Sequence, residues 1–118
     1  MQIKIFTTGG TIDIDDDDRQ LIRETIATDS ATHIIITHGT DSMVKTAEAL
    51  EGISDKTIVL TGSMSPAPFR DSDATFNVGG SVIAVQLLPA GVYIVINGKV
   101  FDPKHAKKNV AMKRYEVI

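Results

Sequence analysis

Three short segments combine threonine, glycine and other polar residues in a way that could support chemistry. They are residues 7–12 (Thr-Thr-Gly-Gly-Thr-Ile), 37–42 (Thr-His-Gly-Thr-Asp-Ser) and 61–64 (Thr-Gly-Ser-Met). Glycine lets the backbone turn sharply, so its N–H groups can approach a ligand and hold a carboxylate or an oxyanion. A threonine hydroxyl becomes a nucleophile when a neighbouring base or relay takes its proton. The segments therefore predict a site for a small ligand of this kind.

Each segment also has a purely structural explanation when it is taken alone. Thr40 or Asp41 could cap a following helix, and the glycines at 9 and 10 could form an ordinary turn between a strand and a helix. His38 is more typical of a packed or hydrogen-bonding histidine than of a catalyst. The three histidines lack metal-ligand spacing, and Ser63 lacks the context of a serine-hydrolase nucleophile. Only the combination of segments is specific.

The elements that would position these segments are short apolar runs. Residues 3–7, 33–37, 57–61 and 92–96 are rich in β-branched residues and apolar on both faces, so we expect strands buried in a parallel sheet. In such sheets ligands bind beyond the carboxyl ends of the strands. The three segments follow the first three runs, and we expect them to meet at one edge of the sheet.

Helical patterns separate these runs, over residues 15–28, 41–50 and 75–88. The four acids at 15–18 complement the positive end of a helix, which favours a helix cap over a metal site. Gly52 is a plausible stop for the second helix. The third is apolar almost all round and contains Gly79 and Gly80. We expect close backbone packing against the sheet or a partner helix to offset the cost of these glycines, and the apolar surface favours a homo-oligomer.

Asn97-Gly98 is typical of a two-residue hairpin turn of type I′. The alternation of strands and helices predicts an α/β fold: a doubly wound, mainly parallel sheet with helices on both faces and a C-terminal β-hairpin. The length suits one domain over residues 1–118.

The motifs together resemble those of the bacterial-type L-asparaginases, over nearly the whole chain and in the family's order. The two signature motifs are Thr-Gly-Gly-Thr-Ile (residues 8–12) and Thr-His-Gly-Thr-Asp (residues 37–41). The resemblance continues through residues 61–66, 70–74 and 76–77, and through the hairpin at 92–101 to Lys107-Lys108. It corresponds to the family's N-terminal domain.

The resemblance implies roles for particular residues. Thr11 is the nucleophile that attacks the amide carbon, and Thr40 and Asp41 work with a lysine, for which Lys108 is the first choice and Lys107 the second. The implied substrate-binding residues are Gly10, Gly39, Asp41, Ser63 and Met64. The implied reaction hydrolyses the side-chain amide of asparagine, or of glutamine, to the acid and ammonia. It needs no metal and no organic cofactor.

The chain departs from the family between Thr11 and the acidic run, where only Ile-Asp-Ile stands. The family has a mobile loop there, with a tyrosine that assists catalysis and a serine beyond it that binds the substrate's carboxylate. Neither Tyr93 nor Tyr115 occupies that position. We therefore expect weak or absent turnover with binding partly retained. The alternative is a non-catalytic module that binds an acidic amino acid or a similar small ligand.

Composition limits the partners. The net charge is −3 and the basic stretch near the C-terminus is short, which argues against nucleic acid. No apolar run approaches the roughly 20 residues that span a membrane, so we expect no membrane partner. The N-terminus does not resemble a secretory signal, and we expect a cytoplasmic protein. The expected partners are a small amino-acid substrate and further copies of the chain.

Overall fold

The computed structural model describes residues 1–8, 14–64 and 73–118. In this part, five strands form one sheet in the order β1 (Ile3–Thr7), β2 (His33–Thr37), β3 (Thr57–Thr61), β4 (Gly91–Ile96) and β5 (Lys99–Phe101). Neighbours among β1 to β4 are parallel, and β5 is antiparallel to β4. The strands expected from the sequence are confirmed, and β4 begins one residue earlier than expected.

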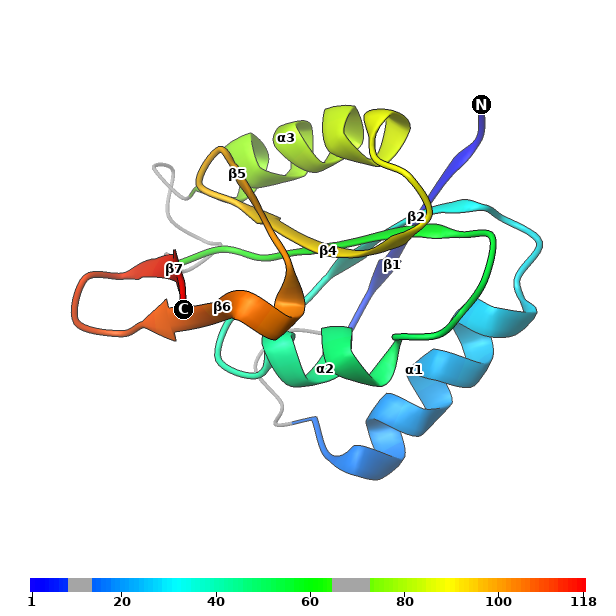
Figure 1. The fold of residues 1–118 in the computed structure, drawn as a ribbon, viewed down its shortest axis with the longest axis horizontal. Coiled ribbons are helices and arrows are strands. Elements are labelled where there is room, and N and C mark those ends of the chain that lie inside the picture. Colours follow the sequence, from blue (N-terminus) through cyan, green and yellow to red (C-terminus); the bar gives the residue numbers. More distant parts are fainter. Residues whose placement is uncertain (9–13, 65–72) are drawn as a thin grey trace.

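Helices cover both faces of this sheet, as Figure 1 shows. Helices α1 (Asp16–Thr28) and α2 (Met43–Ala49) lie on one face, and α3 (Ala74–Leu87) lies on the other. The expected α/β class is therefore confirmed. The strand order runs in one direction although the helices change face, so the β3–α3–β4 connection has the opposite hand to the two before it. Nearly all strand–helix–strand connections between parallel strands are right-handed. Because the connections in this sheet have both hands, at least one of them is left-handed.

The alternation of side chains along the strands divides the core into two layers. Even-numbered residues of β2 and β3, such as Ile34 and Leu60, pack with Ile26 of α1 and Met43 of α2. The smaller layer contains Ile35, Val59 and Val95, which pack with Val85 of α3. Both faces of β2 and β3 are thus buried, as their sequences predict.

The expectation that the first strand is buried is wrong. β1 pairs with β2 alone and stands at the edge of the sheet. Ile5 on this strand remains 51% exposed. The second layer is built from β2, β3, β4 and α3, with Ile3 only partly buried against it. Most of β1 therefore lies outside the packed core.

Helix α1 begins with the acidic cap that the sequence predicts. The Asp15 side chain accepts from the Asp18 backbone N–H, and the Asp18 side chain accepts from the Asp15 N–H. This reciprocal pair is a capping box, and its first hydrogen bond holds the pKa of the Asp15 carboxyl below its ordinary value. The interpretation of residues 15–18 as a helix cap is confirmed.

Helix α2 is shorter than predicted. It begins at Met43 instead of residue 41, and its N-cap is Ser42, whose side chain makes no capping hydrogen bond. Gly52, the expected stop, has φ +89°. It is the second residue after the C-cap Leu50, whereas a stop glycine usually comes directly after the cap. The two residues ahead of the helix, Thr40 and Asp41, are thereby left for other contacts.

The glycines of α3 do not pack closely against the sheet. A side chain built on Gly80 would meet Val95 at an ordinary 3.8 Å, and one built on Gly79 would meet nothing within 4 Å. Close packing against the sheet therefore does not account for either glycine.

Among the helices that the structure describes, none is long and apolar enough to cross a membrane.

The C-terminal part contains one hairpin that the sequence predicts and one that it does not. Asn97 and Gly98 both have positive φ, as a type I′ turn between β4 and β5 requires. A short 3₁₀ helix, η1 (Pro103–His105), then leads to a second hairpin formed by β6 (Ala106–Asn109) and β7 (Arg114–Val117). This unexpected hairpin carries Lys108.

Candidate active site

The three threonines that end the first three strands stand side by side. In the strand register Thr7 is paired with Thr37, and Thr37 is paired with Thr61. The backbone N–H of Thr8 continues the ladder by donating to the Thr37 carbonyl at 3.2 Å, and that of His38 donates to the Thr61 carbonyl at 2.9 Å. The segments that follow these strands therefore start from one edge of the sheet, as the sequence predicts.

Lys108 joins two of the predicted site residues. Its Nζ donates to Oγ1 of Thr40 at 2.7 Å and lies 2.6 Å from Oδ1 of Asp41. Lys107, the second choice, is exposed and pairs with Glu116 in the hairpin ladder. Neighbouring residues of a strand point to opposite faces, so only one of the two lysines can reach the site.

The alternative that Thr40 or Asp41 is a helix cap is not what the structure shows, because Ser42 holds that position. Thr40 is buried although it is polar, and its two oxygens both accept hydrogen bonds. The placement of these two residues is therefore explained by their contacts with the β6–β7 hairpin.

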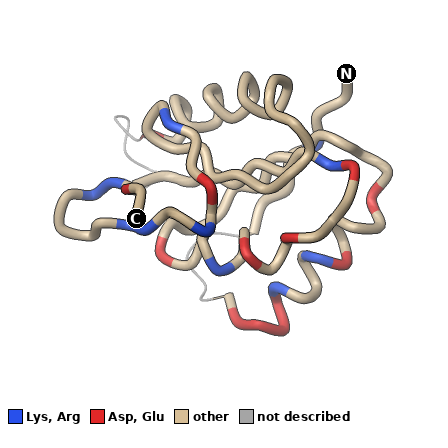
Figure 2. Tube along the Cα trace, in the orientation of Figure 1, with Lys and Arg blue, Asp and Glu red and all other residues tan. Residues whose placement is uncertain are grey.

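The two side chains of the Lys108–Asp41 ion pair differ in their exposure to solvent. The Asp41 side chain is 89% exposed, whereas that of Lys108 is 19% exposed. Exposed ion pairs contribute little to stability because water and salt screen them. Only Oδ1 of Asp41 contacts Lys108, so Oδ2 is directed to a different neighbour or to solvent. Figure 2 shows that several lysines and arginines lie along the β6–β7 hairpin, which carries Lys108.

Tyr115 also contacts Thr40, and sequence reasoning gave it no role. Its hydroxyl donates to the Thr40 backbone carbonyl. The side chain is buried, and its ring lies 6.1 Å from that of Phe101, measured between centroids. Burial, and secondly the charge of Asp41, raise the pKa of the Tyr115 hydroxyl above its ordinary value. The group therefore stays a hydrogen-bond donor at neutral pH.

His38 is a buried hydrogen-bonding residue, as expected. Its Nδ1 lies 2.6 Å from the Gly39 carbonyl and its Nε2 lies 2.7 Å from Oγ1 of Thr46. A carbonyl only accepts, so Nδ1 carries the proton and the Thr46 hydroxyl donates to Nε2. Burial lowers the pKa of His38, which keeps the ring neutral. The ring thus fixes the Gly39 peptide next to Thr40.

Gly62 is required where β3 leaves the sheet. A Cβ at this position would lie 2.2 Å from the backbone carbonyl oxygen of His38, which is closer than any real contact. The second and third segments therefore approach each other backbone to backbone, as their glycines suggest.

Asp73 and Asn77 hold the third segment in place. Asp73 accepts from the Ser63 hydroxyl at 2.6 Å and from the Met64 N–H at 3.0 Å. Asn77 is buried on α3 and donates to the Gly62 carbonyl and to Asp73, while its Oδ1 accepts from the Asn97 N–H. Ser63 and Met64 are thus tied to the start of α3. The sequence signal for Asn77 was an amide side chain between the apolar residues Phe76 and Val78.

Thr11 and Gly10 lie outside the described residues, so their predicted positions are not tested. Helix α1 and the first two strands line an open cavity of about 400 Å³. The lining residues are Phe6, Thr7, Thr8, Ile14, Asp18, Leu21, Ile22, Thr25, Ile26 and Ile36. Thr40, Asp41 and Lys108 are not among them. In the described ranges no three His, Asp or Glu side chains gather closely enough to hold a metal ion.

Known proteins resemble the chain in sequence and in fold. One subunit of the glutamyl-tRNA(Gln) amidotransferase of Methanococcus vannielii is 38% identical over 85 residues, which are 70% of this chain and 20% of that protein. A glutaminase-asparaginase of Acinetobacter glutaminasificans is 31% identical over 94 residues, which are 75% of this chain and 28% of that protein. The crystal structure of a probable cytoplasmic L-asparaginase from Campylobacter jejuni matches with a TM-score of 0.82 and 28% identity, over 93% of this chain and 48% of that one.

The chain therefore spans between 20% and 28% of the length of these two curated relatives. The family model described as "Asparaginase, N-terminal" matches residues 14–116. This range includes Thr40, Asp41 and Lys108 and begins after Thr11. With this match over most of its length, the chain belongs to the asparaginase family.

Proposed function

We propose that the chain is an asparaginase-like amidohydrolase domain that hydrolyses the side-chain amide of asparagine or glutamine to the acid and ammonia. The observation that carries the proposal is the contact of one lysine, Lys108, with both Thr40 and Asp41. The contact joins a hydroxyl, a carboxylate and an ammonium group at the edge where parallel sheets bind ligands.

In the proposed reaction Thr11 attacks the amide carbon and forms a C–O bond, and the amide nitrogen takes a proton and leaves as ammonia. Water then hydrolyses the resulting ester, which gives the acid and restores the threonine. Thr40 acts in the proton transfers. Lys108 donates to its oxygen, so the hydroxyl hydrogen of Thr40 is left for a third group. An ammonium beside a carboxylate stays charged, so Lys108 and Asp41 orient and polarise Thr40.

The proposed substrate is a small amino acid. Oδ2 of the exposed Asp41 carboxylate suits its α-ammonium group, because Lys108 occupies only Oδ1. Backbone N–H groups of Gly10 and Gly39 would stabilise the oxyanion, and Ser63 and Met64 would border the substrate. The short connection after Thr11 leaves out the closing loop that commonly completes such a site, so turnover is expected to be weak.

Ammonia release from asparagine and from glutamine tests the proposal, with Thr11→Val as the paired variant. The variant removes one hydroxyl and keeps the shape of the side chain. We expect slow release by the unaltered chain and none by the variant. Equal release by both chains, or none by either, contradicts catalysis by Thr11.

A non-catalytic module is the second candidate, and the short connection after Thr11 is the observation that favours it. It would bind aspartate without releasing ammonia from asparagine. Aspartate should then raise the unfolding temperature in proportion to the logarithm of its concentration well above its Kd. No stabilisation by aspartate and no ammonia release would exclude both candidates.

We also propose that the chain forms a homo-oligomer through α3. Phe76, Ile83 and Leu87 recur at helical spacing and are 62%, 59% and 78% exposed. Gly79 leaves open space beside them. The helix has no charged residue, so two copies can meet without repulsion. Sedimentation velocity should show an oligomer that Ile83→Glu dissociates, and a monomer at tens of micromolar would contradict this.

A further inference from the structure

Lys108 and Tyr115 form a cross-strand pair in the β6–β7 hairpin. Both side chains reach the same residue of the β2–α2 segment, at different groups. Lys108 donates to the side-chain oxygen of Thr40, and Tyr115 donates to its backbone carbonyl oxygen. The hairpin therefore holds Thr40 at two points.

We propose that Tyr115 is a positioning residue, which fixes the Thr40 peptide so that the Thr40 hydroxyl keeps one rotamer and stays against Lys108. This inference rests on the proposed function only where it predicts a change in kcat for ammonia release. The geometric part stands on the contacts of the described residues.

The two hydrogen bonds, one to the side chain and one to the backbone, together restrain Thr40 more than either would alone. A threonine side chain has three staggered χ1 rotamers, and only one of them directs Oγ1 to a given neighbour. The contact with Lys108 selects that rotamer only while the backbone of Thr40 stays in place. The peptide unit is planar, so a hydrogen bond at the Thr40 carbonyl also fixes the direction of the Asp41 N–H.

Tyr115 is itself held firmly enough to serve in this way. It is 4% exposed and packs against Phe101, and Ala106 beside it in the hairpin is equally buried. Burial raises the pKa of the Tyr115 hydroxyl, so this group stays a hydrogen-bond donor at neutral pH. A phenylalanine ring could make the same packing contact with Phe101. The hydroxyl of Tyr115 therefore contributes through its hydrogen bond to Thr40 and not through packing.

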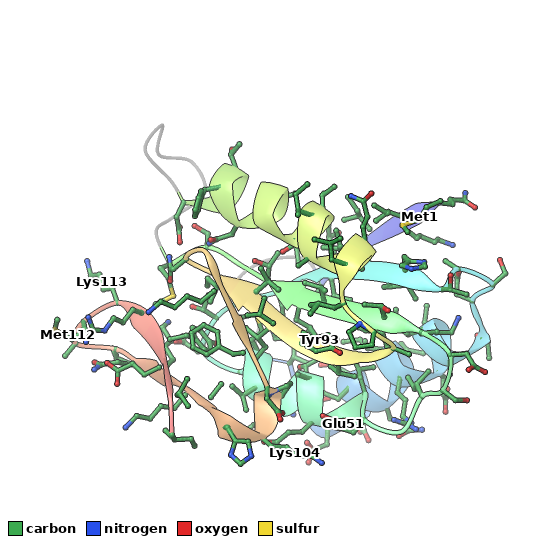
Figure 3. All side chains as sticks on the ribbon, turned by 45° about the horizontal axis from the view of Figure 1, so that its top comes forward. Met1, Glu51, Tyr93, Lys104, Met112 and Lys113 are labelled. Carbon is green, nitrogen blue, oxygen red and sulfur yellow. The ribbon has the colours of Figure 1, made fainter. Side chains whose placement is uncertain are left out.

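The chain offers a matched control for loss of this hydroxyl. Tyr93 on β4 also donates its hydroxyl to a backbone carbonyl, that of Pro89, at 2.9 Å. Figure 3 labels Tyr93 on the sheet, away from the tip of the β6–β7 hairpin marked by Met112 and Lys113. Tyr93→Phe therefore removes the same kind of hydrogen bond at a place without contact to Thr40.

The experiment compares the unaltered chain, Tyr115→Phe and Tyr93→Phe by two readouts. The first is the set of three-bond NMR couplings to Cγ2 of Thr40, which report its χ1 rotamer without any turnover. The second is kcat and KM for ammonia release. Phenylalanine keeps the ring contact with Phe101, so we expect Tyr115→Phe to remain folded, which its unfolding temperature checks.

We expect the Thr40 couplings to average between rotamers in Tyr115→Phe alone, and kcat to fall roughly tenfold or more with KM within about twofold. A single Thr40 rotamer in Tyr115→Phe overturns the inference, and so does an unchanged kcat. If the unaltered chain releases no ammonia, the proposed function fails, while the couplings still decide whether Tyr115 positions Thr40.

Discussion

Nζ of Lys108 lies 2.7 Å from Oγ1 of Thr40, although 68 positions separate the two residues in the sequence. The contact joins the β6–β7 hairpin to the segment that follows β2, and the hairpin is not part of the five-stranded sheet. The chain reaches this point through the β4–β5 turn and η1. The candidate site therefore depends on how several turns are built, and substitutions at those turns test it as well as substitutions at the reacting groups.

Two glycines should respond in opposite ways to alanine. Gly62→Ala places a Cβ 2.2 Å from the His38 carbonyl oxygen, which forces the two backbones apart. Overpacking of this kind costs about 1–3 kcal/mol. Gly79→Ala meets nothing within 4 Å in the helix α3 and should stabilise the chain by about 0.5–1 kcal/mol. Urea unfolding of the monomeric form, at a protein concentration too low for association, measures both, and destabilisation by Gly79→Ala there would contradict the open space beside Gly79 within one chain.

Asn77→Ala should destabilise the chain by about 2–4 kcal/mol. The substitution leaves the Gly62 carbonyl, the Asn97 N–H and one Asp73 oxygen without the partner that Asn77 supplies. Gln86→Ala is the control, because Gln86 is exposed on the same helix and, among the described residues, its side chain donates only to the Val82 carbonyl one turn earlier. Equal unfolding free energies for the two variants would contradict the role given to Asn77.

Acidification should weaken the fold through His38. Burial lowers its pKa in the folded state, so the unfolded chain binds more protons below the ordinary value of 6.5. Stability is therefore fully present above that pH and falls as the pH drops towards the folded pKa. The lowered pKa values of Asp29 and Glu116 act only at more acidic pH, below their ordinary 3.8 and 4.5. Unfolding temperatures between pH 7 and pH 5 should decline in the unaltered chain and decline less in His38→Gln.

Much of the sheet follows from local patterns, because its strands are β-branched runs that end at threonine and glycine. The register of Thr7, Thr37 and Thr61 then brings the three segments to one edge. The same patterns do not reveal that β1 is an edge strand. β1 shares its β-branched, threonine-ended pattern with β2, but it carries Lys4 where β2 has isoleucine, and this charge was the one local sign of an edge strand. The placement of the neighbouring elements leaves Ile5 exposed.

The β6–β7 hairpin could not be predicted because its turn lacks the usual residues. Residues 110–113 contain no glycine, proline or asparagine, and Lys113 takes the left-handed conformation at φ 52°. Lys108 was expected at the site from the family resemblance alone, and Tyr115 was not expected there. Its contact with Thr40 spans 75 positions and has no local signal.

The most direct test of the proposed site compares Lys108→Met with Lys107→Met in ammonia release from asparagine. Both variants remove one ammonium group from the same strand, and only Lys108 contacts Thr40 and Asp41. We predict that Lys108→Met lowers kcat by about a hundredfold or more, within the range for lost acid–base groups, and that Lys107→Met leaves it within about twofold. Equal activities of the two variants would contradict the assignment of Thr40, Asp41 and Lys108 to one working site.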